Sequence, residues 1–254
     1  TMSKMTIKDC NVLVIERRMG ADGRVWAEAE IQWERSDFIS GQYIMAAEKK
    51  HDVNWPSPLM IQKKTDNGFL VLIHENSPLA DLEMGDGLTV WGPCGRGLDI
   101  EENKSYAAIC DGKGVLLLMP FLNALKGKCI GIYMTSHCEG SWKSQWENSS
   151  IPVFEAMTIE KIVQQERVRK AELILAAVPL ETVSVWKKQQ DSFLEKKTKI
   201  FTGVKIGCGL GACRGCYIHT QDNPQGIAVC QEGPYLSMDT IDYFRDQNFL
   251  AHFV

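Results

Sequence analysis

Apolar and polar residues alternate through roughly the first 100 positions of the 254-residue chain. The alternation is clearest at residues 24–31, where it has a period of two. This period is typical of an antiparallel strand with one buried face. Similar stretches lie at residues 6–8, 11–16, 38–47, 57–62, 68–73 and 87–92, with glycine, aspartate and proline between them. The series predicts a small antiparallel barrel or sandwich of six or seven strands.

A different pattern begins near residue 105, where short apolar runs alternate with longer amphipathic stretches. The apolar runs predict strands at residues 106–110, 128–134, 151–155, 171–177 and 199–204. Between them, residues 116–125, 158–169 and 181–196 have the composition of helices. Strands that alternate with helices form a parallel sheet covered by those helices. We therefore expect a Rossmann-like domain to follow the barrel.

Composition excludes several classes of function. The net charge is −4, so the chain lacks the basic surface that binds nucleic acid. No apolar run reaches the roughly 18 residues that a membrane-spanning helix requires. The first residues lack the apolar core of a secretory signal. A cytoplasmic protein of ordinary globular composition is expected.

A cysteine motif near the C-terminus is the most specific feature of the sequence. Its spacing is C-x4-C-x2-C, with a fourth cysteine after 13 intervening residues. Four thiolates at this spacing suit a plant-type [2Fe-2S] cluster, and the ligands are Cys208, Cys213, Cys216 and Cys230. A loop around a compact inorganic core also needs small residues, so that the backbone approaches the sulfurs. Four glycines supply them, at positions 207, 209, 211 and 215.

Zinc and disulfides are the alternatives for these cysteines. Zinc sites more often pair two C-x2-C units, and only Cys213 and Cys216 form one here. Disulfides belong to oxidising compartments, and nothing else in the sequence indicates secretion. The five remaining cysteines have no metal-ligand spacing and are expected to be small buried residues, at positions 10, 94, 110, 129 and 138.

Three segments together resemble a known family. They are residues 41–45 (GQYIM), residues 84–98 (MGDGLTVWGPCGRGL), and the cysteine motif with the Glu-Gly-Pro-Tyr that follows it at 232–235. They are similar to segments of the electron-transfer subunit of type B dihydroorotate dehydrogenase, in the ferredoxin-reductase superfamily. The resemblance implies an FAD-type barrel at residues 1–103, a degenerate Rossmann-like domain at 104–203 and a [2Fe-2S] module at 204–254.

The flavin site that this resemblance implies is altered. An Arg-Pro-x-Ser segment of the family corresponds to Ser57, Pro58, Leu59 and Met60, and a hydroxyl does not replace the bidentate charge of arginine against pyrophosphate. A later Gly-Thr pair corresponds to Asn76 and Ser77, which keeps a hydroxyl. The backbone can still lie close to a cofactor at three glycines, Gly92, Gly95 and Gly97. FAD binding is left open, because backbone amides and apolar contacts also anchor cofactors.

The nicotinamide site is altered further. A dinucleotide-binding turn is rich in glycine, so that its N–H groups meet phosphate. Here the turn reads Asp111-Gly112-Lys113-Gly114, with an acidic residue where the anion belongs. The family's Cys-Gly-Pro corresponds to Ala177-Val178-Pro179. We therefore expect no use of NAD(P).

These features predict an electron-transfer subunit rather than an enzyme that acts alone. Its cluster, with or without FAD, would relay electrons to or from a catalytic oxidoreductase subunit that carries a flavin or a metal. An NADH-oxidising reductase subunit with FAD and a cluster is one alternative. A structural subunit whose cysteines bind zinc is another. Residue sets typical of hydrolytic catalysis are missing from the sequence, so no catalytic residue is predicted.

Overall fold

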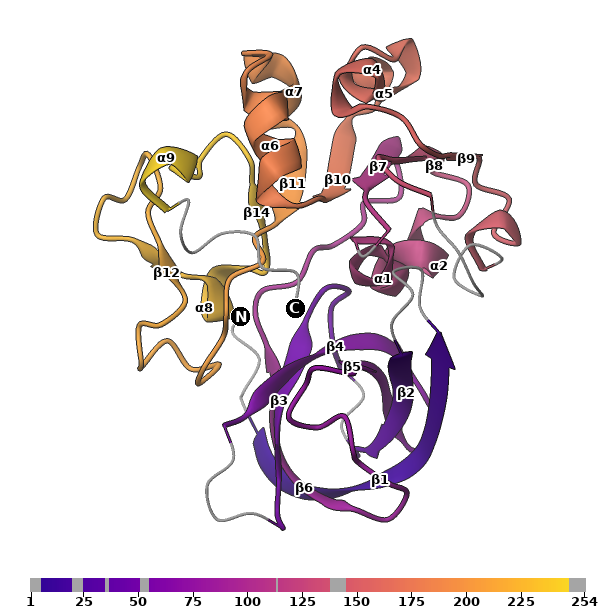
Figure 1. Cartoon of the computed structure of the whole chain (residues 1–254), viewed down its shortest axis with the longest axis vertical. Helices are drawn as coiled ribbons and strands as arrows, with labels where there is room; N and C mark the ends of the chain where they lie inside the picture. The colour runs from indigo at the N-terminus through magenta and orange to yellow at the C-terminus, as the bar shows by residue number, and fades with distance from the viewer. Residues whose placement is uncertain are drawn as a thin grey trace.

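The computed structural model describes residues 6–19, 25–34, 37–50, 55–112, 114–137 and 145–246. Its N-terminal part is a closed antiparallel barrel with the strand order β1-β2-β5-β4-β3-β6 (Figure 1). The strands are β1 (Thr6–Met19), β2 (Val25–Gln32), β3 (Tyr43–Glu48), β4 (Ser57–Lys64), β5 (Gly68–His74) and β6 (Gly87–Cys94). In β2, every second residue is buried, as the period of two predicts.

One barrel strand differs from its prediction. Residues 6–8 and 11–16 belong to the single long strand β1, not to two strands. The first half of β1 pairs with β6 and the second half with β2. The register shifts between Val12 and Val14, so β1 bends there and closes the barrel. The bend interrupts the alternation, which explains the predicted break.

A six-stranded sheet forms the second part, with the order β14-β11-β10-β7-β8-β9. Its strands are β7 (Tyr106–Cys110), β8 (Cys129–Met134), β9 (Val153–Phe154), β10 (Leu173–Ala177), β11 (Thr198–Phe201) and β14 (Tyr235–Ser237). Five of them are parallel, which confirms the Rossmann-like prediction. The exception is β14, which pairs antiparallel with β11 and comes from the segment after the cysteines. The segment from residue 204 to 246, here called the cysteine module, is therefore joined to the sheet by a strand.

Each predicted helix is broken into shorter pieces. Residues 116–125 form α1 (Gly114–Leu118), the 3-10 helix η1 (Met119–Phe121) and α2 (Leu122–Leu125), with the break at Pro120. Residues 158–169 become α4 (Ile159–Val163) and α5 (Glu166–Lys170). Residues 181–196 become α6 (Leu180–Lys187) and α7 (Ser192–Lys196), because Asp191 caps a new helix by accepting a hydrogen bond from the Leu194 N–H.

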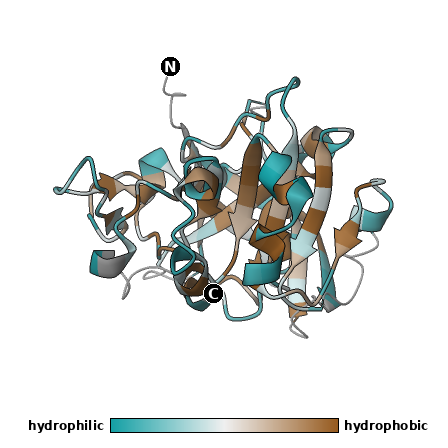
Figure 2. Cartoon of the chain, turned by 90° about the horizontal axis from the view of Figure 1, so that it is seen from above, coloured by the Kyte–Doolittle hydropathy of each residue, from teal (hydrophilic) through white to brown (hydrophobic). Residues whose placement is uncertain are grey.

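Apolar residues concentrate on the strands, and the outer loops and helices are largely hydrophilic (Figure 2). The cysteine module lies beside the sheet edge and above the barrel (Figure 1). It contains β12 (Tyr217–Ile218), β13 (Ile227–Ala228), α8 (Val229–Glu232) and α9 (Tyr243–Asp246). Among the residues described, no helix combines the length and the apolar character needed to cross a membrane.

Candidate iron–sulfur centre

The four predicted ligand cysteines lie in the loop between β11 and β12 and at α8. Cys216 and Cys230 are buried, Cys208 is half-buried and Cys213 is exposed. The small sheet of β12 and β13 brings α8 back to the loop, since Tyr217 pairs with Ala228. Sequence positions 216 and 230 therefore become neighbours in space, as a shared cluster requires.

Each of the four sulfurs accepts a hydrogen bond from a backbone N–H. The N···S distances are 3.3 Å from Leu210 to Cys208, 3.4 Å from Gly215 to Cys213, 3.4 Å from Cys230 to Cys216 and 3.1 Å from Gly211 to Cys230. N–H donors aimed at sulfur stabilise the negative charge of thiolates and of a cluster that they ligate. The backbone is thus arranged for four charged sulfurs before any metal is considered.

The thiols form two contacting pairs. Cys216 contacts Cys230, whose thiol donates to the Cys216 sulfur; this contact and the backbone N–H groups lower the pKa of Cys216 to about 6. The same contact, together with burial, raises the pKa of Cys230. Burial raises the pKa of Cys208, but hydrogen bonds from the Cys213 and Leu210 N–H groups and the Cys213 thiol outweigh it, and the pKa falls to about 7.

Two of the four loop glycines adopt backbone conformations that other residues avoid. Gly209 has φ of +71° and Gly211 has φ of +75°, in the left-handed region. At Gly207 and Gly215 the backbone instead runs close to a sulfur, because an added Cβ would lie 3.6 Å from the Cys213 Sγ atom in each case. Arg214 also has a positive φ, of 58°, and its guanidinium lies 5.9 Å from the centroid of the Tyr217 ring.

This donor set fits a two-iron cluster better than a single zinc ion. A zinc ion needs its ligands around one point. Two pairs of thiols suit two irons, each of which takes two cysteines. The exposed and half-buried pair, Cys208 with Cys213, would hold the outer iron, and the buried pair the inner one.

The barrel contacts the backbone of two ligands, which the sequence did not predict. The Tyr43 hydroxyl, on β3, donates to the carbonyl oxygen of Cys230 at 3.0 Å. The Trp91 ring N–H, on β6, donates to the carbonyl oxygen of Cys208 at 2.9 Å. The partners are 187 and 117 residues apart, so no local spacing reveals them. Only the fold brings barrel and loop together.

The four predicted flavin positions at the start of β4 lack a cationic side chain. Ser57 and Leu59 are buried, and Leu59 belongs to the core of the barrel. Pro58 is exposed. Met60 packs against the apolar core that connects the barrel with the sheet. None of these four positions offers the charge that pyrophosphate requires.

The other predicted flavin residues have roles within the chain. Asn76 and Ser77 form the turn after β5, where the Ser77 hydroxyl accepts a backbone N–H. A Cβ atom added at Gly92, Gly95 or Gly97 would lie 3.2, 2.6 or 2.9 Å from other protein atoms. Packing within the protein therefore accounts for these glycines. None of the nine residues carries a charge that could pair with pyrophosphate, and FAD binding stays a prediction.

The turn predicted to lack a nucleotide site contains its own anion. The Asp111 carboxylate accepts the Gly114 N–H at 2.6 Å, and the Gly112 N–H donates to the Ser136 hydroxyl at 2.7 Å. An added Cβ at Gly114 would lie 1.8 Å from the carbonyl oxygen of Ala177. Two N–H groups of the kind that bind phosphate are thus used within the protein. Lys113 lies outside the described residues.

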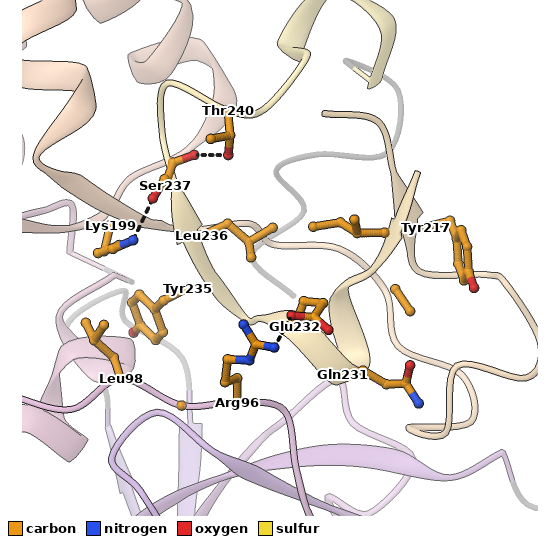
Figure 3. Close-up of a pocket in the computed structure, with 13 residues that line it drawn as sticks. Arg96, Leu98, Lys199, Tyr217, Gln231, Glu232, Tyr235, Leu236, Ser237 and Thr240 are labelled. Atoms are coloured by element: carbon orange, nitrogen blue, oxygen red, sulfur yellow. Dashed lines mark hydrogen bonds and ion pairs between the residues drawn. The ribbon is translucent and has the colours of Figure 1, made fainter. Parts of the chain in front are cut away.

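A cavity of about 430 Å³ lies where the barrel, the sheet edge and the cysteine module meet (Figure 3). Leu98, Tyr235 and Leu236 contribute apolar walls. Its charged groups are partnered: Arg96 pairs with Glu232 at 2.9 Å, and Lys199 donates to the Ser237 hydroxyl at 2.5 Å. Among the predicted flavin residues, only Gly97 lines it.

Of the five other cysteines, four are buried, at positions 10, 94, 110 and 129. Burial raises the pKa of three of these thiols, to about 11 at Cys10, about 12 at Cys94 and about 11 at Cys129. They therefore stay neutral at pH 7, as expected of small buried residues. Cys138 lies outside the described residues.

Comparison with known proteins agrees with this geometry. Residues 205–242 match the iron–sulfur cluster binding domain of dihydroorotate dehydrogenase B. The electron-transfer subunit of dihydroorotate dehydrogenase B (NAD(+)) from Listeria monocytogenes is 23% identical over 228 residues, which are 81% of this chain and 88% of that subunit. The subunit of that name from Bacillus cereus is 42% identical over 45 residues, 16% of this chain and 17% of that subunit. Over most of its length the chain is distantly similar to these electron-transfer subunits, and its cysteine segment matches their cluster-binding domain.

Solved structures show that the chain has the ferredoxin-reductase fold. A chain of the NADH-dependent reduced ferredoxin–NADP oxidoreductase, described for flavin-based electron bifurcation, superposes with a TM-score of 0.72 at 16% identity, covering 95% of this chain and 92% of that one. Ferredoxin–NADP+ reductase from Plasmodium falciparum gives 0.57 at 14% identity, over 76% and 94% of the two chains. The resemblance and the fold class expected from the sequence are thereby confirmed.

Proposed function

We propose that the chain is the electron-transfer subunit of a dihydroorotate-dehydrogenase-like oxidoreductase, with a [2Fe-2S] cluster held by Cys208, Cys213, Cys216 and Cys230. The observation that carries this proposal is that each of the four sulfurs accepts a hydrogen bond from a backbone N–H. When bound, such a cluster takes up and releases one electron at a time. The chain would hold the cluster in place, donate hydrogen bonds to its cysteine ligands and shield it from water.

The second part of the proposal is that this subunit does not oxidise a nicotinamide nucleotide. Asp111 supports it, because its carboxylate accepts the Gly114 N–H and would repel a pyrophosphate placed there. A nucleotide would also have to displace the Ser136 hydroxyl from the Gly112 N–H. Electrons would therefore enter the cluster from another redox protein or from the catalytic subunit.

The exposed side of the cysteine loop suits contact with such a partner. Cys213 and Arg214 are exposed, and the Leu210 side chain is 40% exposed. Ile7, 67% exposed, lies opposite Trp91 in the ladder between β1 and β6, next to the loop. Apolar side chains around a positive charge form a contact surface that favours an acidic rim on the partner. A catalytic subunit with its own flavin or metal would dock here.

Anaerobic purification of the full chain tests the proposal. We expect about two irons and two sulfides per chain, visible absorbance, and an electron paramagnetic resonance signal after reduction with dithionite. NADH or NADPH added to the same sample should leave the absorbance unchanged, while dithionite bleaches it. Acid extraction of the sample measures bound flavin independently.

The outcomes separate the alternatives. A colourless protein with one zinc per chain would refute the proposed cluster and indicate a structural subunit whose cysteines bind zinc. Bleaching by NADH together with bound flavin would identify an NADH-oxidising reductase subunit and refute the role of Asp111. Iron and sulfide without any response to NADH support both parts of the proposal.

A further inference from the structure

We propose that Tyr43 and Trp91 are positioning residues that connect the cluster to the barrel and tune its reduction potential. The inference rests on the proposed function, because it needs a cluster in the loop. It assigns a role to the barrel that is independent of any nucleotide. The two donors come from neighbouring strands, since β3 pairs with β6.

The two hydrogen bonds reach one ligand of each sulfur pair. Tyr43 donates to the carbonyl of Cys230, which is paired with Cys216. Trp91 donates to the carbonyl of Cys208, which is paired with Cys213. Each iron of the cluster would therefore have one ligand whose peptide is fixed by the barrel. A loop rich in glycine has little rigidity of its own, so these two contacts limit its movement.

The Tyr43 contact is buried and the Trp91 contact is partly buried, so both are sheltered from competing water. Tyr43 is 2% exposed, and its hydroxyl lies 3.0 Å from the carbonyl oxygen of Cys230. Between the two donors, Met45 lies against Gly209 of the loop. The barrel thus meets the loop with two donors around an apolar contact, which excludes water from that side.

The same geometry implies an electrostatic effect. In both bonds the positive end of an O–H or N–H dipole points toward the ligand backbone. Positive potential near a cluster favours its reduced form, which has one more negative charge. Loss of either donor should therefore shift the midpoint potential to a more negative value and loosen the loop.

The test uses Tyr43→Phe and Trp91→Phe in the full chain, purified without oxygen. Each variant should release iron to a chelator about fivefold faster than the wild type, the factor that corresponds to one hydrogen bond. Each should also show a more negative midpoint potential in a redox titration followed by electron paramagnetic resonance. Tyr133→Phe and Trp33→Phe are the matched controls. Tyr133 packs on Phe154 in the other domain, and the Trp33 ring N–H has no hydrogen-bond partner among the described residues.

If Tyr43 and Trp91 only stabilised the fold, their replacement would lower the free energy of unfolding and leave the midpoint potential of the cluster unchanged. Wild-type potential and iron release in both cluster-facing variants would overturn the inference. A shift of the same size in the two controls would overturn it as well. Should the wild type contain no cluster, the proposed function itself fails, and iron analysis of that sample shows this before any variant is compared.

Discussion

Gly209 packs directly on Met45: a Cβ atom added to the glycine would lie 2.5 Å from the Met45 Cγ atom. The same atom would lie 3.3 Å from the Cys94 sulfur. Gly209 follows the first cysteine of the motif, and its φ of +71° is one that side chains rarely adopt. The start of the cysteine loop is therefore fixed by contact with the barrel as well as by its own turn.

Gly209→Ala should disrupt the loop. An alanine held at this positive φ would lower the free energy of unfolding by about 1–2 kcal/mol. The added methyl group would also collide with Met45. We expect a lower iron content per chain and a lower unfolding temperature. Iron analysis of freshly purified protein, together with thermal unfolding, measures both.

Gly215→Ala is the matched control for that substitution. Gly215 is also in the loop, but its φ is not positive, and an added Cβ would contact only the Cys213 sulfur, at 3.6 Å. Its iron content should stay near that of the wild type. Equal loss in the two variants would show that the contact of Gly209 with Met45 has no special role.

Cys213→Ser should remove most of the iron. A neutral hydroxyl is a much weaker ligand for iron than a thiolate, so iron affinity should fall at least about tenfold. Cys129→Ser is the control, because Cys129 is buried in β8 and its Sγ atom donates to the Gly131 carbonyl, which a hydroxyl can also do. Normal iron in the Cys213 variant would contradict the ligand assignment.

Local signals in the sequence were sufficient for much of the fold. The period of two in residues 24–31 gave β2, and the cysteine spacing gave the loop, because both depend on residues close together in the chain. The helices were predicted too long. Pro120 and the cap at Asp191 divide them, because proline interrupts the helical hydrogen bonds and the aspartate starts a new helix.

Contacts between distant segments could not be predicted in the same way. The pairing of β14 with β11 depends on how the chain returns after Cys230, and the donors Tyr43 and Trp91 look like ordinary barrel residues in sequence. Asp111 is a partial exception. Its acidic character predicts that no phosphate binds there, which stays a prediction, and the structure adds that its carboxylate accepts the Gly114 N–H.

Asp111→Ala should lower stability without affecting the cluster. The carboxylate accepts the Gly114 N–H, and the Asp111 carbonyl accepts the Val115 N–H at 3.2 Å, so Asp111 acts as the N-terminal cap of α1. Loss of such a cap costs about 1 kcal/mol. Chemical denaturation should show this loss, while iron content and potential stay unchanged. The exposed Asp99, replaced by alanine, serves as the control and should leave stability within error.

Arg214→Gln should make the midpoint potential of the cluster more negative. Arg214 lies directly after the ligand Cys213, and its guanidinium is held near the Tyr217 ring, so its charge stays close to the cluster. Removing one positive charge near the surface should shift the potential by on the order of tens of millivolts, and the shift should shrink as salt is added. Lys170→Gln, an exposed substitution in α5 of the other domain, should leave the potential unchanged. If Arg214→Gln gives the wild-type potential at low salt, the Arg214 charge does not act on the cluster, and its role is confined to contact with the partner.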